Sequence, residues 1–165
     1  VQTCALPILE KAHEHLNAPF TREGSENPYS LHQELQQVTQ DLVGIIRNEG
    51  ELKDALKKLE NIRSRAEKVK AVGGRAFNPG FHLAIDLENM LMVSEAIARS
   101  ALEREESRGG HTRDDYPKMD SEWRQYNHLS TWGGKKIDVE ADKAAMLPDE
   151  LLGLFEVDEI GRAHV

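Results

Sequence analysis

The 165-residue sequence is poor in several residues that mark common protein classes. Its single cysteine, Cys4, excludes an internal disulfide framework and a zinc site built from several cysteines. Aromatic residues make up only 5% of the chain, which favours a helical module over a β-sandwich. No apolar run approaches the roughly 20 residues that a membrane-spanning helix needs, so any membrane association should come through a partner.

Positive charge is also scarce relative to negative charge. The chain has 21 Lys and Arg residues against 29 Asp and Glu residues, which gives a net charge of -8. The basic residues are interspersed with acidic ones and form no basic stripe, so binding to a nucleic-acid phosphate backbone is not expected. A chain of this length is enough for one domain of ordinary size.

The two ends resemble translations of one sequencing adapter, read once in each direction. The adapter-like segments are residues 1–8 and 159–165. We therefore expect the native insert to span about residues 9–158 and to be a fragment of a larger protein. Under this interpretation Cys4 and His164 carry no biological information.

Three segments show the three- and four-residue apolar spacing of amphipathic helices. The first begins after Asn27 and Pro28, a helix-starting pair, and its apolar stripe extends to Ile46. We expect residues 48–50 to form a turn, with Gly50 in the left-handed conformation, followed by a second stripe over 52–69. So short a turn predicts an antiparallel helical hairpin.

The third stripe follows a Gly- and Pro-rich break and a second Asn-Pro pair, Asn78 and Pro79. It covers residues 81–107 and is apolar on more than one side, which is typical of a central helix. The predicted fold is all-α, a three-helix antiparallel bundle of the spectrin-repeat kind with an irregular C-terminal tail. The expected divisions of the insert are a linker at 9–26 that starts with a short helical end, the helical domain at 27–126, and an extended tail at 127–158 with a short helix at 151–155.

Most candidate sites are weak when judged by spacing alone. His13 and His15 lack the four-residue spacing that places two metal ligands on one helix face, and no third ligand follows. Gly73-Gly74 and Gly109-Gly110 match no phosphate-binding loop and are interpreted as turns. No metal site is predicted.

The run after the third helix is the most site-like stretch of the chain. Two glycines allow close backbone approach, and Arg108 and Arg113 offer planar donors for a carboxylate. On spacing alone we favour a helix end followed by an ion-paired docking loop, and a catalytic role is the less favoured alternative. The residues singled out are Glu106, Ser107, Arg108, Gly109, Gly110, His111, Arg113, Asp114 and Tyr116.

This run, completed by Pro117, resembles the signature of the C-terminal helical domain of succinate dehydrogenase and fumarate reductase flavoprotein subunits, which L-aspartate oxidase shares. Residues 26–32, 78–83 and 87–91 are most similar to the actinobacterial type, and the resemblance covers most of residues 9–126. Residues 148–155 also fit that type, although the tail as a whole resembles the family less.

The resemblance implies an intact subunit that interconverts succinate and fumarate and passes electrons through FAD to an iron–sulfur subunit. Its flavin-binding glycines, flavin-attachment histidine, proton-transferring arginine and substrate-carboxylate ligands would lie upstream, in an FAD-binding domain and a capping domain. None of the residues of this chain is therefore assigned to catalysis, cofactor binding or metal binding. The fragment should be inactive alone and should dock onto its own FAD domain and the iron–sulfur subunit. A membrane anchor subunit would hold the complex at the cytoplasmic face.

Two alternatives remain open at this point. L-Aspartate oxidase shares the helical signature but needs no iron–sulfur or membrane partner. A free-standing helical interaction module would be a binding protein that is not part of an enzyme. Its gene should have a native start codon just upstream of Leu9. The upstream genomic sequence would separate these alternatives from the dehydrogenase.

Overall fold

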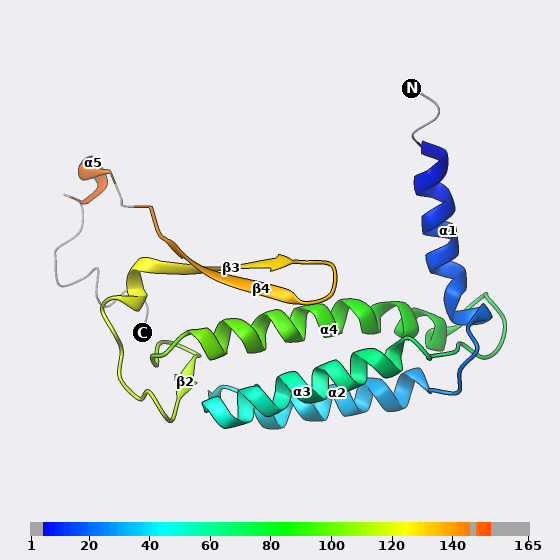
Figure 1. Cartoon of the computed structure of the whole chain (residues 1–165), viewed down its shortest axis with the longest axis horizontal. Helices are drawn as coiled ribbons and strands as arrows, with labels where there is room; N and C mark the ends of the chain where they lie inside the picture. The colour runs from blue at the N-terminus through cyan, green and yellow to red at the C-terminus, as the bar shows by residue number, and fades with distance from the viewer. Residues whose placement is uncertain (1–4, 146–147, 153–165) are drawn as a thin grey trace. The chain divides into compact units, whose positions relative to one another are not determined.

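The computed structural model describes residues 5–145 and 148–152. The chain forms two compact units, one from residues 1–41 and 56–94 and the other from 42–55 and 95–165. None of the helices in the described ranges is long and apolar enough to cross a bilayer. The elements in Figure 1 are α1 (Ala5–Thr21), α2 (Pro28–Leu42), β1 (Ile46–Arg47), α3 (Glu49–Ala66), α4 (Pro79–Glu103), β2 (Thr112–Arg113), the 3₁₀ helix η1 (Trp123–Gln125), β3 (Tyr126–Trp132), β4 (Ile137–Lys143) and α5 (Asp149–Leu152).

Two predicted asparagine caps start the long helices of the first unit. The Asn27 side-chain oxygen accepts a hydrogen bond from the Tyr29 N–H at 2.9 Å, at the start of α2. The Asn78 side-chain oxygen accepts one from the Phe81 N–H at 3.0 Å, at the start of α4. Each cap satisfies a backbone donor that a helix start leaves unpaired, which confirms both predicted helix starts.

The core of the first unit contains the predicted apolar stripes. Buried positions on α2, α3 and α4 recur three and four residues apart, as expected for helices that each bury one face. Arg65 on α3 adds polar contacts, because its guanidinium donates to Glu34 on α2 at 2.7 Å and to Glu26 at 3.0 Å. The buried apolar residues are Leu31, Leu35, Val38, Leu59, Ile62, Ala66, Ala84, Leu87 and Leu91.

The expected short helical end is the 17-residue helix α1, which contains Pro19. Its end is attached to the loop after α3, where the Ala71 N–H donates to the Pro19 carbonyl at 2.7 Å. A Cβ atom on Gly24 would lie 2.1 Å from the Lys68 carbonyl oxygen, so only glycine fits there. Residues 5–8 of the adapter-like segment lie in α1, whereas 1–4 and 159–165 are outside the described residues.

The connection between α2 and α3 differs from the prediction. The first helix ends at Leu42, and Ile46, which we expected on its apolar stripe, lies in β1 and is 64% exposed. The predicted turn at 48–50 instead starts α3, because the Asn48 side chain accepts the Glu51 N–H at 3.0 Å and Gly50 lies in the first helical turn. The reason is a distant contact: β1 pairs in parallel with β2, which apolar periodicity does not reveal.

The tail also corrects the all-α prediction. Strands β3 and β4 form an antiparallel hairpin in the second unit, so the chain is mostly helical with two small sheets. Gly133 and Gly134 lie in the hairpin turn, where Gly134 has φ of 89°. Residues 137–142 of β4 alternate apolar and polar residues, a strand signal that our prediction missed, whereas β3 has no such alternation. Of the two strands only Ile137 is buried. The predicted helix at 151–155 is observed in part, as α5, and Phe155 lies outside the described residues.

Candidate functional site

Arg113 lies at the C-terminal end of α4 in the second unit. Its side chain is 1% exposed, and its Nη1 donates to the carbonyls of Ala101 at 2.9 Å, Leu102 at 3.1 Å and Arg104 at 3.2 Å. The last carbonyls of a helix have no partner within the helix and carry partial negative charge. The Arg113 cation supplies both the donors and the charge, which explains why α4 ends at Glu103 and not at the predicted Ser107.

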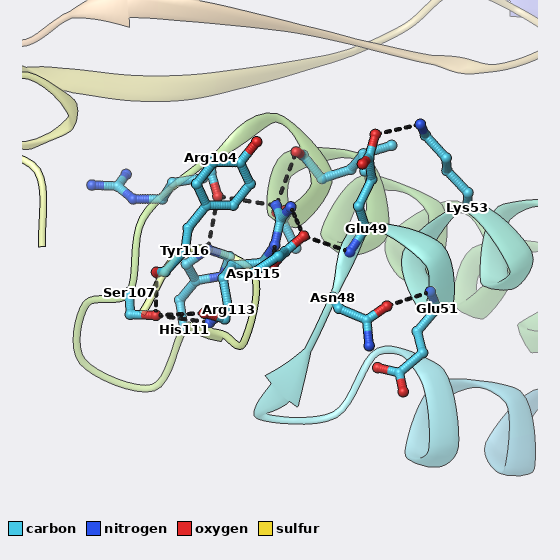
Figure 2. A network of polar contacts seen from close by, with 12 residues as sticks. Asn48, Glu49, Glu51, Lys53, Arg104, Ser107, His111, Arg113, Asp115 and Tyr116 are labelled. Atoms are coloured by element: carbon cyan, nitrogen blue, oxygen red, sulfur yellow. Dashed lines mark hydrogen bonds and ion pairs between the residues drawn. The ribbon is translucent and has the colours of Figure 1, made fainter. Parts of the chain in front are cut away.

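Asp115 connects Arg113 to the start of α3, as Figure 2 shows. Its two carboxylate oxygens accept from Arg113 Nε and Nη2, each at 2.8 Å, and Oδ2 also accepts from the Glu49 N–H at 2.9 Å. The Arg113 hydrogen bond lowers the pKa of Asp115 to about 2, although burial opposes this change. Each charge therefore lies at the helix end that favours it, the cation at a C-terminus and the anion at an N-terminus.

Ser107 and Tyr116 fold the loop around Arg113. The Ser107 hydroxyl accepts from the Arg113 N–H at 2.8 Å and donates to the Tyr116 carbonyl at 2.8 Å. The Tyr116 ring centre lies 4.9 Å from the Arg113 Cζ atom, within cation–π range. The loop is thus held by its own side chains against a buried cation.

Glu106 is the centre of a second polar cluster. Its side chain is 0% exposed and accepts hydrogen bonds from Arg108 Nη2 at 2.9 Å, Arg104 Nε at 2.8 Å and the Asp120 N–H at 2.8 Å. Burial raises the pKa of this carboxyl, but the two arginines and the Asp120 N–H outweigh burial and lower the pKa to about 2. Glu106 is therefore a buried anion with two cationic partners.

Gly109 and Gly110 form the tight turn that the sequence predicts. Arg108 and His111 flank it and exchange two backbone hydrogen bonds, at 2.8 Å and 3.0 Å. Gly109 has φ of 57°, a left-handed conformation that side-chain-bearing residues rarely adopt. Gly110 has no such requirement, and no atom within 4 Å would meet a Cβ at either position.

These neighbouring glycines offer a matched pair of substitutions. We expect Gly109→Ala to lower the free energy of unfolding by about 1–2 kcal/mol, because alanine is strained at positive φ. Gly110→Ala should change it by less than about 0.5 kcal/mol. Urea unfolding of both variants, followed by circular dichroism, measures the difference. A Gly109→Ala effect as small as that expected for Gly110→Ala would mean that the turn tolerates a side chain at Gly109.

His111 lies beside these clusters and is half-buried. Its Nε2 is 3.0 Å from the Arg104 carbonyl oxygen. Burial lowers the pKa of His111, and the cations of Arg47, Arg113 and Arg104 lower it further against the opposing effect of that carbonyl. The ring is therefore neutral near pH 7, and its Nε2–H donates to the carbonyl.

Most of the site residues predicted from the sequence lie together in the two polar clusters. One predicted residue lies outside them, and one important residue was not predicted. Asp114, which the set includes, is exposed, and its N–H donates to the Arg47 carbonyl at 3.0 Å. Asp115, which it omits, is the residue that joins the two helix ends. Sequence reasoning also missed Arg47 and Asn48, because their position after an apolar stretch suggested only a helix end and a turn. In the described part of the chain, no three His, Cys, Asp or Glu side chains lie close enough to hold a metal ion.

Comparison with known proteins places this arrangement in a family. Residues 32–150 match the family described as fumarate reductase flavoprotein C-term. An uncharacterized FAD-dependent oxidoreductase of Methanocaldococcus jannaschii is 41% identical over 102 residues, which is 62% of this chain and 18% of that protein. The fumarate reductase flavoprotein subunit of Helicobacter pylori strain J99 is 30% identical over 134 residues, covering 80% of this chain and 19% of the relative.

The fold of this chain is also similar to a solved structure. Mycobacterium smegmatis Sdh1, in complex with UQ1, aligns with a TM-score of 0.82 and 45% identity over 96% of this chain and 28% of that chain. The chain spans about a fifth of the length of the curated relatives it matches. Both the family match, which extends over most of the sequence, and the shared fold include the Glu106 and Arg113 clusters, and the chain therefore belongs to the fumarate reductase flavoprotein C-terminal family.

Proposed function

We propose that this chain is the C-terminal helical part of a flavoprotein subunit that interconverts succinate and fumarate. The relatives support this proposal, since they include fumarate reductase flavoprotein subunits and a succinate dehydrogenase flavoprotein subunit from Coxiella burnetii, 38% identical over 96 residues. The names of these relatives favour a succinate dehydrogenase or fumarate reductase subunit over an L-aspartate oxidase. The intact subunit would bind FAD in its upstream domain and transfer electrons from the flavin to an iron–sulfur subunit.

The role of this chain in that subunit would be structural. Helices α2, α3 and α4 would pack as the antiparallel bundle predicted from the sequence. This bundle would follow the segment at 9–26, which contains most of α1, and precede the segment at 127–158, which contains most of the β3–β4 hairpin. The bundle would dock onto the FAD domain and toward the iron–sulfur subunit. Through that subunit and a membrane anchor subunit, the complex would lie at the cytoplasmic face of the membrane.

The proposed structural role rests on one observation: the charged signature residues bind one another and the ends of neighbouring helices and loops. Arg113 binds the α4 carbonyls and Asp115, and Glu106 binds Arg104 and Arg108. A proton donor or substrate ligand needs an atom directed at the reacting molecule. These charged side chains are instead occupied in holding helix and loop ends, as expected of a docking element.

We expect the 165-residue chain to bind no FAD and to catalyse no fumarate-dependent oxidation of a reduced dye. Isothermal titration with FAD and a dye-coupled assay measure the two properties. The positive control is the full-length subunit recovered from the upstream reading frame. It should retain flavin on purification and reduce dye with succinate.

Three results would contradict this proposal. Flavin binding or turnover by the 165-residue chain would overturn its structural role. A full-length subunit that binds flavin but oxidises L-aspartate and not succinate would overturn the choice of reaction. An upstream reading frame without a flavin domain would favour the free-standing interaction module.

A further inference from the structure

An open depression of about 490 Å³ lies in the second unit, between the C-terminal part of α4 and the β3–β4 hairpin. Its polar lining comes from Arg47, Arg104, His111 and His128, together with Ser100 and Ser130. The remaining lining is apolar or backbone, from Ala96, Ile97, Ala101 and Gly110. None of these ten lining residues carries a carboxylate, so the charge of the lining is positive.

Arg47 is the unusual member of this lining. The residue is only 8% exposed, yet its Nε–H, which is buried, has no hydrogen-bond partner. Its Nη2 reaches the Gly110 carbonyl only at 3.5 Å, the outer limit of a hydrogen bond. A guanidinium stays charged in proteins, and a buried charge without an anionic partner is costly. The Arg47 side chain therefore lacks an anion.

His128 supplies a second orphan group to the same depression. Its Nε2 is buried without a hydrogen-bond partner, and its ring is stacked 5.5 Å from the Trp123 ring, which restrains its orientation. Arg104, by contrast, is already engaged by Glu106 and by the Trp123 carbonyl at 3.1 Å. The buried nitrogens without a partner are therefore Arg47 Nε and His128 Nε2, and the His128 nitrogen is a donor in the Nε2–H tautomer.

We propose that this depression binds one carboxylate group, which accepts hydrogen bonds from Arg47 and His128. A carboxylate matches the planar guanidinium and offers two acceptor oxygens. The apolar side chains of Ala96, Ile97 and Ala101 can contact the short aliphatic stem that bears it. Because the depression is open, the carboxylate can belong to a free carboxylic acid or to an acidic side chain of a docked polypeptide.

The first test titrates the 165-residue chain with sodium acetate and sodium succinate at constant ionic strength, with sodium chloride as the reference. NMR follows the Arg47 Nε–H and the His128 ring. We expect saturable shifts with a dissociation constant on the order of millimolar. Arg47→Gln should weaken binding at least about tenfold, whereas the exposed Arg75→Gln, which lines no part of the depression, should leave it unchanged.

The two acids separate the sources of the carboxylate. Succinate binding more than about tenfold tighter than acetate would identify a free dicarboxylic acid, because its second carboxylate adds contacts. Similar affinities would show that only one carboxylate is recognised. An acidic peptide that binds more than about tenfold tighter than acetate would then identify the side chain of a polypeptide as the source. Shifts that do not saturate, or that persist in Arg47→Gln, would overturn the proposal.

A second test remains valid even if Arg47→Gln fails to fold. Ser130 lines the depression, and its cross-strand partner Val139 carries no charge. Ser130→Asp should place a carboxylate in the depression, raise the unfolding midpoint by about 4 °C relative to the uncharged Ser130→Asn, and abolish acetate binding. Equal midpoints for the two variants, or unchanged acetate binding in Ser130→Asp, would overturn the proposal.

Discussion

Replacing Arg113 by leucine should lower the free energy of unfolding of the chain by about 3–5 kcal/mol, the range measured when one partner of a buried ion pair is removed. The substitution leaves Asp115 without its cation and the carbonyls of Ala101, Leu102 and Arg104 without their donor. It therefore loosens the end of α4 and the start of α3 together. Urea denaturation followed by circular dichroism at pH 7 measures the loss.

Two further variants make this result specific. Arg75 is exposed, and Arg75→Leu should cost less than about 1 kcal/mol, because its contacts with Asn17 and the Phe20 ring lie at the surface. The double variant Arg113→Leu/Asp115→Leu should be less destabilised than the sum of the single variants by about 1–3 kcal/mol, since the two side chains contact each other. Additive effects would show that Arg113 acts without Asp115.

Glu106→Gln should have a comparably large effect, and that effect should depend on pH. The folded-state pKa of Glu106 is about 2, below the ordinary value of 4.5, so folding favours the ionised form. Its contribution to stability is present in full above about pH 4.5 and is lost as the pH falls through about 2. The difference corresponds to about 3 kcal/mol at pH 7. Glutamine removes the charge and leaves Arg104 and Arg108 without their anion.

The measurement is the free energy of unfolding of both proteins between pH 7 and about pH 2. The variant should be less stable by about 3 kcal/mol at neutral pH and should approach the unaltered chain at the acid end of the range. Glu60→Gln, on the exposed face of α3, serves as the control and should follow the unaltered chain throughout. A constant difference across the whole pH range would show that the charge of Glu106 is not what stabilises the fold.

Several features of this protein could be predicted from short stretches of sequence. The caps at Asn27 and Asn78 lie where predicted, because a side chain two or three residues away satisfies the helix start. The apolar stripes identified α2, α3 and α4, because a helix that buries one face must repeat at 3.6 residues. The turn at Gly109 followed from glycine chemistry, and the run from Glu106 to Tyr116 indicated the family that the comparisons established.

Other features depend on residues far apart in the sequence, and only the tertiary structure decided them. The α2–α3 connection depends on pairing between residues 46–47 and 112–113. The hairpin at 126–143 depends on cross-strand hydrogen bonds, and only its second strand, β4, has the apolar alternation of a strand. Residues 106–116, which were singled out from the sequence, form two ion-paired clusters because the fold buries Glu106 and Arg113. The burial of Arg47, and with it the cationic depression, had no sequence signal. Local periodicity and capping thus determined which segments are helical, whereas long-range burial decided which charges have partners, because desolvation depends on the whole fold.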